Sequence, residues 1–354
     1  MLGMTSLARK PRKLEQAWTE SVGDHVIDLA FSPDGAWLAA ASVAGPVTVF
    51  DAVTGRIAHE FTGHGFGTSS VSWHHDSMRL ATGGQDGVVR IWNARVGALM
   101  TELDPGSGWT ERIAFSPRGQ LLATAAGQRL RFWTPDGELV RKFPDQSSTI
   151  ADVAWKPAAA TSSRKSELIA ATSYALVSTW NCESDEPKDE YRWQGSSLAL
   201  AWSPNGQYLA TGDQDASVHF WITKTGSDLR MSGFETKVKE LAWERTSRYL
   251  ATGGGRMACV WDCSGAGPEG RQPAMLKIHE DRITSLVYQR SGSLLASGAG
   301  DSLIAIWWPE KQDRPLALGA VSAGHGVTKV CWSPDDRALA VGGTGGEVEI
   351  FSML

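Results

Sequence analysis

Residues 31–39 read FSPDGAWLA, and variants of this stretch return along the whole chain. The stretch runs from an aromatic residue through a Ser-Pro-Asp-Gly turn into an apolar segment, and in such a turn proline fixes φ while glycine tolerates a positive φ. Related segments stand at 73–81, 115–123, 202–210, 243–251, 288–296 and 332–340, and an expanded copy begins at Trp155. The chain is therefore built from eight copies of one unit, which we call repeats 1 to 8.

Each copy is followed by an alternating stretch that ends in an aromatic residue. These residues are Phe50, Trp92, Trp133, Trp180, Trp221, Trp261, Trp307 and Phe351. In repeat 1 the pattern predicts four strands, at 26–31, 37–42, 47–50 and 56–61. Short strands of this kind cannot bury both faces alone, so each four-stranded sheet must stack on its neighbours. Radial stacking of such sheets gives an all-β fold of the propeller type.

The repeats resemble those of the WD40-repeat β-propeller family over residues 14–354. In that family a His, a Ser or Thr, an Asp and a Trp form a hydrogen-bonded tetrad within a blade. The matching residues are His64, Thr82, Asp86 and Trp92 in repeat 2, and His279, Ser297, Asp301 and Trp307 in repeat 7. The chemistry is consistent, because a semi-buried carboxylate needs donors and an indole N–H needs an acceptor. The resemblance implies that these residues are structural rather than catalytic.

Other repeats depart from the tetrad pattern. Repeat 5 keeps Thr211, Asp215 and Trp221 but lacks the His. Repeats 1 and 8 keep His25 and His325 but lose the Asp and carry Phe in place of Trp. We therefore expect no tetrad in repeats 1 and 8.

The last repeat stops soon after Phe351 and has no fourth strand of its own. The segment 14–21, LEQAWTES, has strand character and no other partner, so it should pair with the last repeat (329–354) and close the ring. The sequence thus predicts a single eight-bladed propeller over 14–354, with a seven-bladed ring as the alternative. Residues 1–13 are expected to form a flexible basic tail.

Composition excludes several classes of protein. The 354 residues carry a net charge of −5, are 42% hydrophobic and 21% charged, and contain no apolar run long enough to span a membrane. A mildly negative chain is not expected to bind nucleic acid, and no interaction with membranes is expected. The N-terminus lacks the apolar core of a secretory signal, and four cysteines without a pairing pattern favour a reducing compartment. We expect a cytoplasmic protein.

The search for reactive chemistry finds no catalytic, metal or cofactor motif. No Gly-Lys dipeptide is present, which excludes a Walker-type phosphate loop, and no Gly-x-Ser-x-Gly elbow occurs. His59 and His64 are one residue too far apart for a zincin motif, and Cys259 and Cys263 have no second cysteine pair. The sequence predicts neither an enzyme nor a bound cofactor or metal.

Aromatic residues in surface loops suggest where a partner could bind. In a propeller, the loops that join the fourth strand of one blade to the first strand of the next lie on one rim, around the channel mouth. Aromatic side chains there gain little from folding but dominate binding hot spots; the alternative is that each packs back on its own blade. With a polar surround that includes Glu111, the candidate partner-binding residues are Phe66, Trp109, Trp193, Phe234, Arg112, Lys237, Asp281 and Arg282.

The opposite rim offers a second candidate in repeat 4. An insertion, AAATSSRKSE (158–167), and an acidic loop, CESDEPKDE (182–190), both lie on that side. They are either solvated loops or a partner contact specific to this protein.

Two classes of function stay open at this point. The favoured one is a non-enzymatic scaffold, a monomer or a subunit of a complex, that binds a peptide or protein at the channel-mouth rim. A narrower form is a reader of a modified or charged peptide tail. The alternative is a small-molecule sensor or propeller enzyme that uses the central channel, which would need titratable groups or a metal there.

Overall fold

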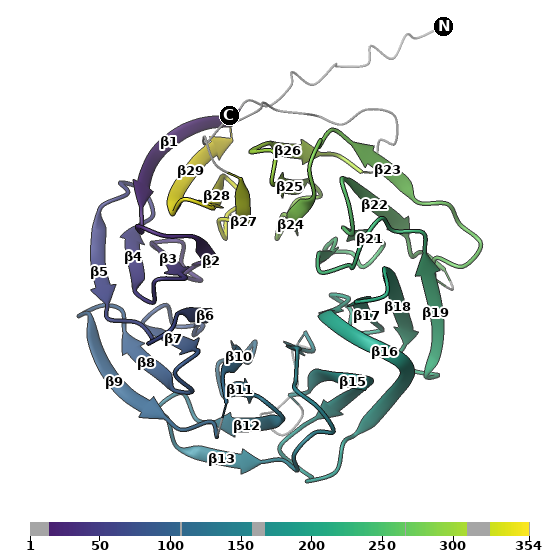
Figure 1. Cartoon of the computed structure of the whole chain (residues 1–354), viewed down its shortest axis with the longest axis horizontal. Helices are drawn as coiled ribbons and strands as arrows, with labels where there is room; N and C mark the ends of the chain where they lie inside the picture. The colour runs from purple at the N-terminus through teal and green to yellow at the C-terminus, as the bar shows by residue number, and fades with distance from the viewer. Residues whose placement is uncertain (1–13, 107, 158–166, 266, 310–325, 354) are drawn as a thin grey trace, which may run out of the picture.

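A computed structural model of the chain describes residues 14–106, 108–157, 167–265, 267–309 and 326–353. Within these residues the chain forms strands arranged around a central axis, and the strands of a repeat follow one another from the inner side outward (Figure 1). The expected basic tail (1–13), most of the insertion in repeat 4 and His325 lie outside the described residues.

Repeats 1 to 3 each form a four-stranded antiparallel sheet in chain order. Their strands are β2 (Val26–Phe31), β3 (Trp37–Ser42), β4 (Val47–Asp51) and β5 (Ile57–Phe61); β6 (Thr68–Trp73), β7 (Arg79–Gly84), β8 (Val89–Asn93) and β9 (Ala98–Leu103); and β10 (Thr110–Phe115), β11 (Leu122–Ala126), β12 (Arg129–Trp133) and β13 (Leu139–Lys142).

Repeats 4 and 5 share one sheet, and repeats 6 to 8 follow. Repeats 4 and 5 contain β14 (Asp152–Trp155), β15 (Ile169–Trp180), β16 (Asp189–Trp202), β17 (Tyr208–Asp213), β18 (Ser217–Ile222) and β19 (Ser227–Ser232). Repeat 6 contains β20 (Leu241–Trp243), β21 (Tyr249–Thr252), β22 (Met257–Asp262) and β23 (Ala274–Lys277). Repeat 7 contains β24 (Ile283–Tyr288), β25 (Leu295–Ala299) and β26 (Ile304–Trp307), and repeat 8 contains β27 (Val327–Trp332), β28 (Ala338–Gly343) and β29 (Glu347–Met353).

The quoted turn shows why these residues form a hairpin. Gly35 has a φ of 76°, which a side chain would resist, and its N–H donates to the Ser32 carbonyl at 2.9 Å. The Ser32 hydroxyl in turn donates to Asp34 at 2.6 Å and accepts the Trp37 N–H at 3.0 Å. The local chemistry therefore fixes the register of β2 against β3 before any packing between sheets is considered.

The ring is closed by β1 (Leu14–Ser21), as the sequence predicts. This strand pairs antiparallel with β29, from Leu14 opposite Met353 to Ser21 opposite Glu347, and forms the outer strand of the repeat 8 sheet. Figure 1 shows β1 outside β29.

The expectation of eight separate blades is not supported. The described strands form seven hydrogen-bonded sheets. If each continuous sheet is counted as one blade, the ring has seven blades, as in the alternative prediction. The reason is β16: its residues 189–192 and Ser196 pair with β15, whereas its residues 197–202 pair with β17. One strand therefore serves both repeat 4 and repeat 5, and the two repeats merge into a six-stranded sheet.

Neighbouring repeats are tied together by the tryptophans that end their inner strands. Each of these indoles donates a hydrogen bond to a backbone carbonyl on the inner strand of the preceding repeat. The pairs are Trp73 to Ala30 (2.9 Å), Trp155 to Ala114 (2.9 Å), Trp202 to Ala154 (3.0 Å), Trp243 to Ala201 (3.3 Å) and Trp332 to Val287 (3.2 Å). The apolar core lies between neighbouring repeats, so these bonds join faces that are already packed.

Candidate functional site

The four tetrad residues of repeat 2 lie in contact. The imidazole of His64 bonds Asp86 through Nδ1 and Thr82 through Nε2, both at 2.8 Å, and the Trp92 indole donates to Thr82 Oγ1 at 3.0 Å. Arg90 adds an ion pair to Asp86 at 2.9 Å. Every polar atom of the group is therefore used within the repeat.

Repeat 7 has the same arrangement. His279 bonds Ser297 at 2.7 Å and Asp301 at 3.3 Å, and the Trp307 indole donates to Ser297 at 2.8 Å. Asp301 also accepts the N–H of Glu280 at 2.7 Å. A similar group in two repeats agrees with a structural tie, because a catalytic group is normally built once.

Electrostatics keep the two histidines neutral and their carboxylate partners ionised. Burial lowers the pKa of His64 and of His279, with a partial offset from the neighbouring aspartates. Burial alone would raise the pKa of Asp86, but the hydrogen bonds from Arg90 and His64 outweigh it and the pKa is lowered. The tetrad of repeat 2 thus carries its negative charge on Asp86, next to Arg90.

Repeat 5 fills the same positions with different chemistry. Trp193 stands 18 residues before Thr211, the spacing of His64 from Thr82, and Asp213 stands where repeat 2 has Gly84. The Trp193 indole donates to Ser197 at 3.2 Å, and its ring lies 4.3 Å from the His219 ring. Burial raises the pKa of Asp213 to about 7, against the opposing effect of the Ser197 and Thr211 hydroxyls.

Two of the four predicted rim aromatics are exposed. Phe66, in the loop between β5 and β6, is 86% exposed, and Trp109, just before β10, is 59% exposed. Phe66 also has a φ of 67°, an unfavourable value for a bulky residue. Hydrogen bonds hold the loop backbone on both sides, from the Gly67 N–H to the His64 carbonyl (3.2 Å) and from the Gln85 N–H to the Gly67 carbonyl (3.0 Å). The loop is thus fixed while the Phe66 side chain faces solvent.

The other two aromatics pack against their own repeats. Trp193 is half-buried over His219, as described above. Phe234 is half-buried, with its ring centroid 6.5 Å from that of Trp261, and belongs to the apolar cluster of repeats 5 and 6. For these two residues the structure favours the alternative interpretation, in which a loop aromatic completes the core of its own blade.

Two of the predicted polar rim residues form ion pairs between repeats. Arg112 lies 3.1 Å from Asp152, whose charge raises the pKa of the guanidinium, and Arg282 lies 3.6 Å from Glu240. Asp281 is exposed, and its carboxylate accepts the N–H of Arg282. Lys237 is half-buried.

Sequence reasoning missed the charges on the inner strands. Asp28, Asp152, Glu240 and Lys329 occupy the same position, three residues before the aromatic that ends each inner strand. Lys329 pairs with Asp28 at 3.1 Å and joins repeat 8 to repeat 1. The pair of Arg282 with Glu240 joins repeat 7 to repeat 6. In both cases the later repeat in the ring has no Trp at the end of its inner strand. Aligning the repeats on that aromatic residue would have revealed this set.

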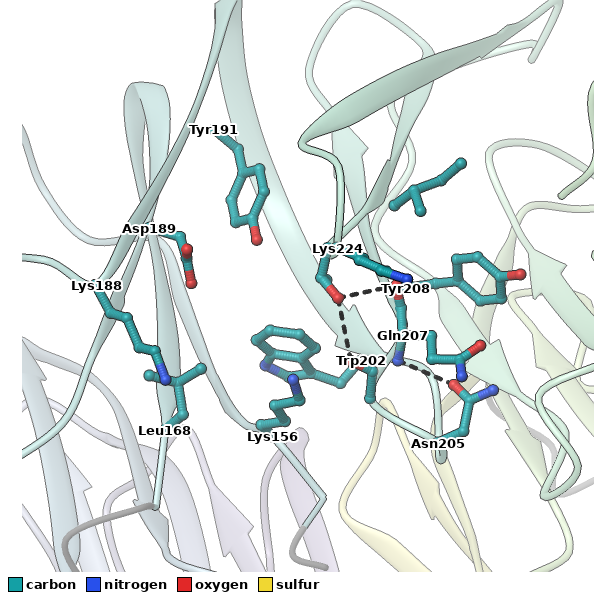
Figure 2. Close-up of a pocket in the computed structure, with 13 residues that line it drawn as sticks. Lys156, Leu168, Lys188, Asp189, Tyr191, Trp202, Asn205, Gln207, Tyr208 and Lys224 are labelled. Atoms are coloured by element: carbon teal, nitrogen blue, oxygen red, sulfur yellow. Dashed lines mark hydrogen bonds between the residues drawn. The ribbon is translucent and has the colours of Figure 1, made fainter. Parts of the chain in front are cut away.

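A cavity of about 510 Å³ opens between repeats 4 and 5, on the rim opposite Phe66 and Trp109. Figure 2 shows Lys188, Asp189 and Tyr191 on one side of it, Gln207 and Tyr208 on the other, and the Trp202 ring between them. The acidic loop at 182–190 ends at its edge, with Lys188 and Asp189 among the lining residues. The sequence located this region through the loop but gave no sign of a hollow.

The remaining chemistry is sparse in the part of the chain that the structure describes. The four cysteines are free thiols, and burial raises the pKa of Cys259 to about 11. No group of three or more His, Cys, Asp or Glu residues there is arranged to hold a metal ion. No helix in the same residues is long and apolar enough to cross a membrane.

Repeats with these ties, arranged radially and closed by the first described strand, define a WD40-repeat β-propeller. Family models agree: one described as "IFT122 first beta-propeller" matches residues 25–267, and one described as "WD domain, G-beta repeat" matches residues 270–307 and 318–352. Because the first model matches more than half of the chain, the protein belongs to this family of WD40-repeat propellers.

Several curated proteins are similar in sequence. The chain is 25% identical over 276 residues to the B-type cell cycle switch protein ccs52A of Medicago truncatula, covering 72% of this chain and 54% of that protein. It is 24% identical over 337 residues to the protein hir1 of Schizosaccharomyces pombe, covering 78% and 34%. The chain thus spans about half or less of the length of these relatives. The names of other relatives describe an APC/C activator and a transcriptional corepressor.

A solved structure shares the fold. The computationally designed protein Ika8 superimposes with a TM-score of 0.77 over 96% of this chain and 99% of its own, at 20% sequence identity. At that identity the likeness concerns the fold alone.

Proposed function

We propose that the protein is a non-enzymatic scaffold that binds a peptide or protein partner on the rim that carries Phe66 and Trp109. The observation that carries the proposal is Phe66, a largely exposed aromatic side chain on a backbone fixed at positive φ. Strained residues persist where the surrounding structure holds them, and they cluster at binding sites. An aromatic side chain that is already positioned loses little conformational entropy when a partner covers it.

Trp109 extends the surface to the next repeat. It precedes β10, and its carbonyl accepts the Gly127 N–H at 3.2 Å, so its backbone is also tied to the sheet. Two exposed aromatics on consecutive loops of one rim form an apolar anchor of the kind that partner proteins recognise. Relatives named as a cell cycle switch protein, an activator and a corepressor agree with a regulatory role through partners.

The alternative of a sensor or enzyme in the central channel gains no support from the inner strands. Several of their charged residues lie in pairs of opposite sign, such as Lys329 with Asp28 and Arg112 with Asp152. Because these charges are paired between neighbouring repeats, they stabilise the ring and do not form an unpaired charged site for a substrate. A cytoplasmic location stays a prediction.

The test compares two double variants in capture from a native lysate with quantitative mass spectrometry. Phe66→Ser with Trp109→Ser removes the proposed anchor. Val53→Ser with Val96→Ser removes two similarly exposed apolar side chains from turns on the opposite rim, where they are 81% and 65% exposed. We expect both variants to melt at the wild-type temperature, and only the first to lose its partners. Equal capture by the two variants would overturn the proposal.

A further inference from the structure

The cavity between repeats 4 and 5 is lined by connections between strands that are distant in the sequence and that the fold brings together. Lys156 follows β14, Lys188 precedes β16, and Lys224 lies in the turn after β18, so the three lysines come from three separate connections. The volume of about 510 Å³ is that of a small-ligand site rather than a packing defect. Trp202 and Tyr191, both on β16, form its aromatic wall (Figure 2).

The charge of the cavity is unbalanced. Three lysines line it against the single carboxylate of Asp189, and no described residue forms an ion pair with any of the three. The Asp189 carboxylate accepts the Thr179 hydroxyl at 3.1 Å, and its charge also acts on Lys156, so it balances one of the three lysines. The lining thus carries two positive charges that no protein group neutralises.

Lys188 is close enough to Lys156 for its charge to disfavour the charged form of Lys156. The ammonium of Lys156 lies 5.1 Å from the centroid of the Trp202 ring. Burial lowers the pKa of Lys156, and the charge of Lys188 lowers it further. The Asp189 carboxylate offsets only part of this repulsion, so an anion between the two ammonium groups would stabilise them further.

The remaining lining groups suit an anion that is carried on a larger molecule. Burial raises the pKa of Tyr191 to about 12, so its hydroxyl keeps its proton and can donate a hydrogen bond. The rings of Trp202 and Tyr191 offer apolar surface beside the lysines. Gly206, in the turn opposite, leaves room for the Lys156 side chain, because a Cβ there would lie 2.5 Å from Lys156 Cε.

We propose that this cavity binds a phosphate monoester, with Lys156, Lys188 and Lys224 holding the phosphate and Trp202 and Tyr191 contacting the group that carries it. A phosphate monoester at neutral pH carries close to two negative charges, which matches the net charge of the lining. Lysine ammonium groups bind phosphate as point charges and can approach it from several directions. A phosphorylated peptide and a small phosphorylated metabolite share this chemistry. The site is on the rim opposite the proposed partner surface and does not depend on it.

Isothermal titration calorimetry tests the proposal with three probes. These are a short phosphoserine peptide, the same peptide without phosphate, and glycerol phosphate as a small monoester. We expect at least one phosphorylated probe to bind and the unphosphorylated peptide to bind at least tenfold more weakly; the tighter of the two phosphorylated probes identifies the source. Failure of both phosphorylated probes to bind, or equal binding with and without phosphate, would overturn the proposal.

Matched variants locate the binding. Lys156→Gln, Lys188→Gln and Lys224→Gln should each weaken the phosphorylated probe about fivefold to tenfold, because each removes one charge at the phosphate. Lys142→Gln, an exposed lysine at the end of β13, changes the net charge equally and should leave binding unchanged. A loss of affinity that is the same for Lys142→Gln would show a general charge effect and overturn the assignment.

A second measurement uses the unaltered protein. Reductive methylation followed by mass spectrometry reports the accessibility of each lysine. The bound phosphorylated probe should protect Lys156, Lys188 and Lys224 while Lys142 reacts at its original rate. Unchanged labelling of the three cavity lysines under saturating probe would contradict the proposal.

Discussion

Repeats 2 and 5 have the same strand pattern but stabilise it with opposite responses to pH. In repeat 2, the neutral His64 occupies the space above Gly84 and bonds Thr82 and Asp86. In repeat 5, Trp193 stands at the His64 position, and the buried carboxyl of Asp213 stands at the Gly84 position. The same space is thus filled by His64 in repeat 2 and by the side chain of the second strand, Asp213, in repeat 5. Folding favours the neutral form of each of these two groups.

The sign of each response follows from the direction of the pKa shift. Burial lowers the pKa of His64 from 6.5, so the unfolded chain binds the proton more tightly and stability is lost as pH falls below about 6.5. Burial raises the pKa of Asp213 from 3.8 to about 7, so the folded chain holds the proton more tightly and stability is lost as pH rises from 3.8 to about 7.

The largest effect is expected from Asp213→Asn. Each unit of pKa shift corresponds to about 1.4 kcal/mol, so ionising Asp213 in the folded protein costs up to roughly 4 kcal/mol above pH 7. The variant removes this cost, so its free energy of unfolding should match the wild type near pH 4 and exceed it near pH 8. Denaturant unfolding at both pH values measures the difference. A gap between the two proteins that does not change with pH would show that the carboxyl is not the cause.

Gly84→Ala should lower the stability of the protein, although the equivalent position in repeat 5 carries the side chain of Asp213. A Cβ at position 84 would lie 2.3 Å from His64 Cβ and 2.6 Å from the Gly67 carbonyl oxygen, so the imidazole and the loop must move. We expect a loss of about 3 kcal/mol. Gly65→Ala is the control, because its Cβ would meet Asp86 Cβ at 3.8 Å, an ordinary contact. Equal melting temperatures for the two variants would refute the steric argument.

Thr82→Val and Thr211→Val compare the same hydroxyl in the two repeats. Thr82 Oγ1 bonds both His64 and the Trp92 indole, whereas Thr211 Oγ1 is buried without either bond. Removing the first hydroxyl should cost about 2 kcal/mol, since it leaves two buried groups without a partner, and removing the second less than about 1 kcal/mol. Thermal melting of both variants checks the ranking; a larger loss from Thr211→Val would reverse our account of repeat 5.

The smallest effect is expected from Phe66→Ala. Its side chain faces solvent, so the change should alter the free energy of unfolding by less than about 0.5 kcal/mol. Trp193→Ala, on β16 at the position in repeat 5 that corresponds to His64, should cost about 1.5 kcal/mol, because the ring packs on His219 and bonds Ser197. If Phe66→Ala were the more destabilising change, the exposed aromatic would have a structural role instead of the proposed one.

The sequence predicts the repeats well because the turn and strand chemistry is local. The Ser-Pro-Asp-Gly turn, the alternating strands and the pairing of residues 14–21 with the last repeat all follow from short segments. The continuous strand β16 does not, because its two halves pair with strands of different repeats, and this depends on how those repeats pack. The exposure of loop aromatics depends on distant neighbours: Phe234 lies against Trp261, whereas Phe66 meets no such ring.

The cavity was beyond the reach of sequence for the same reason. Lys156 and Lys224 are separated by more than one repeat in the sequence. They line the same cavity because β16 pairs with strands of both repeats. The ion pairs between inner strands are partly predictable. The sequence shows the position of the charged residues within each repeat, but it does not show which of them pair.

The pairing of β1 with β29 also orders events during synthesis. Gln16 bonds Glu349 across 333 residues, so β1 leaves the ribosome long before its partner exists. At roughly 5–20 residues per second, the strand waits about 15 to 70 s before β29 is made. An unpaired strand edge is prone to wrong pairing with other chains. The charged and polar side chains of LEQAWTES, most of them exposed even in the finished ring, keep the waiting strand soluble until the ring can close.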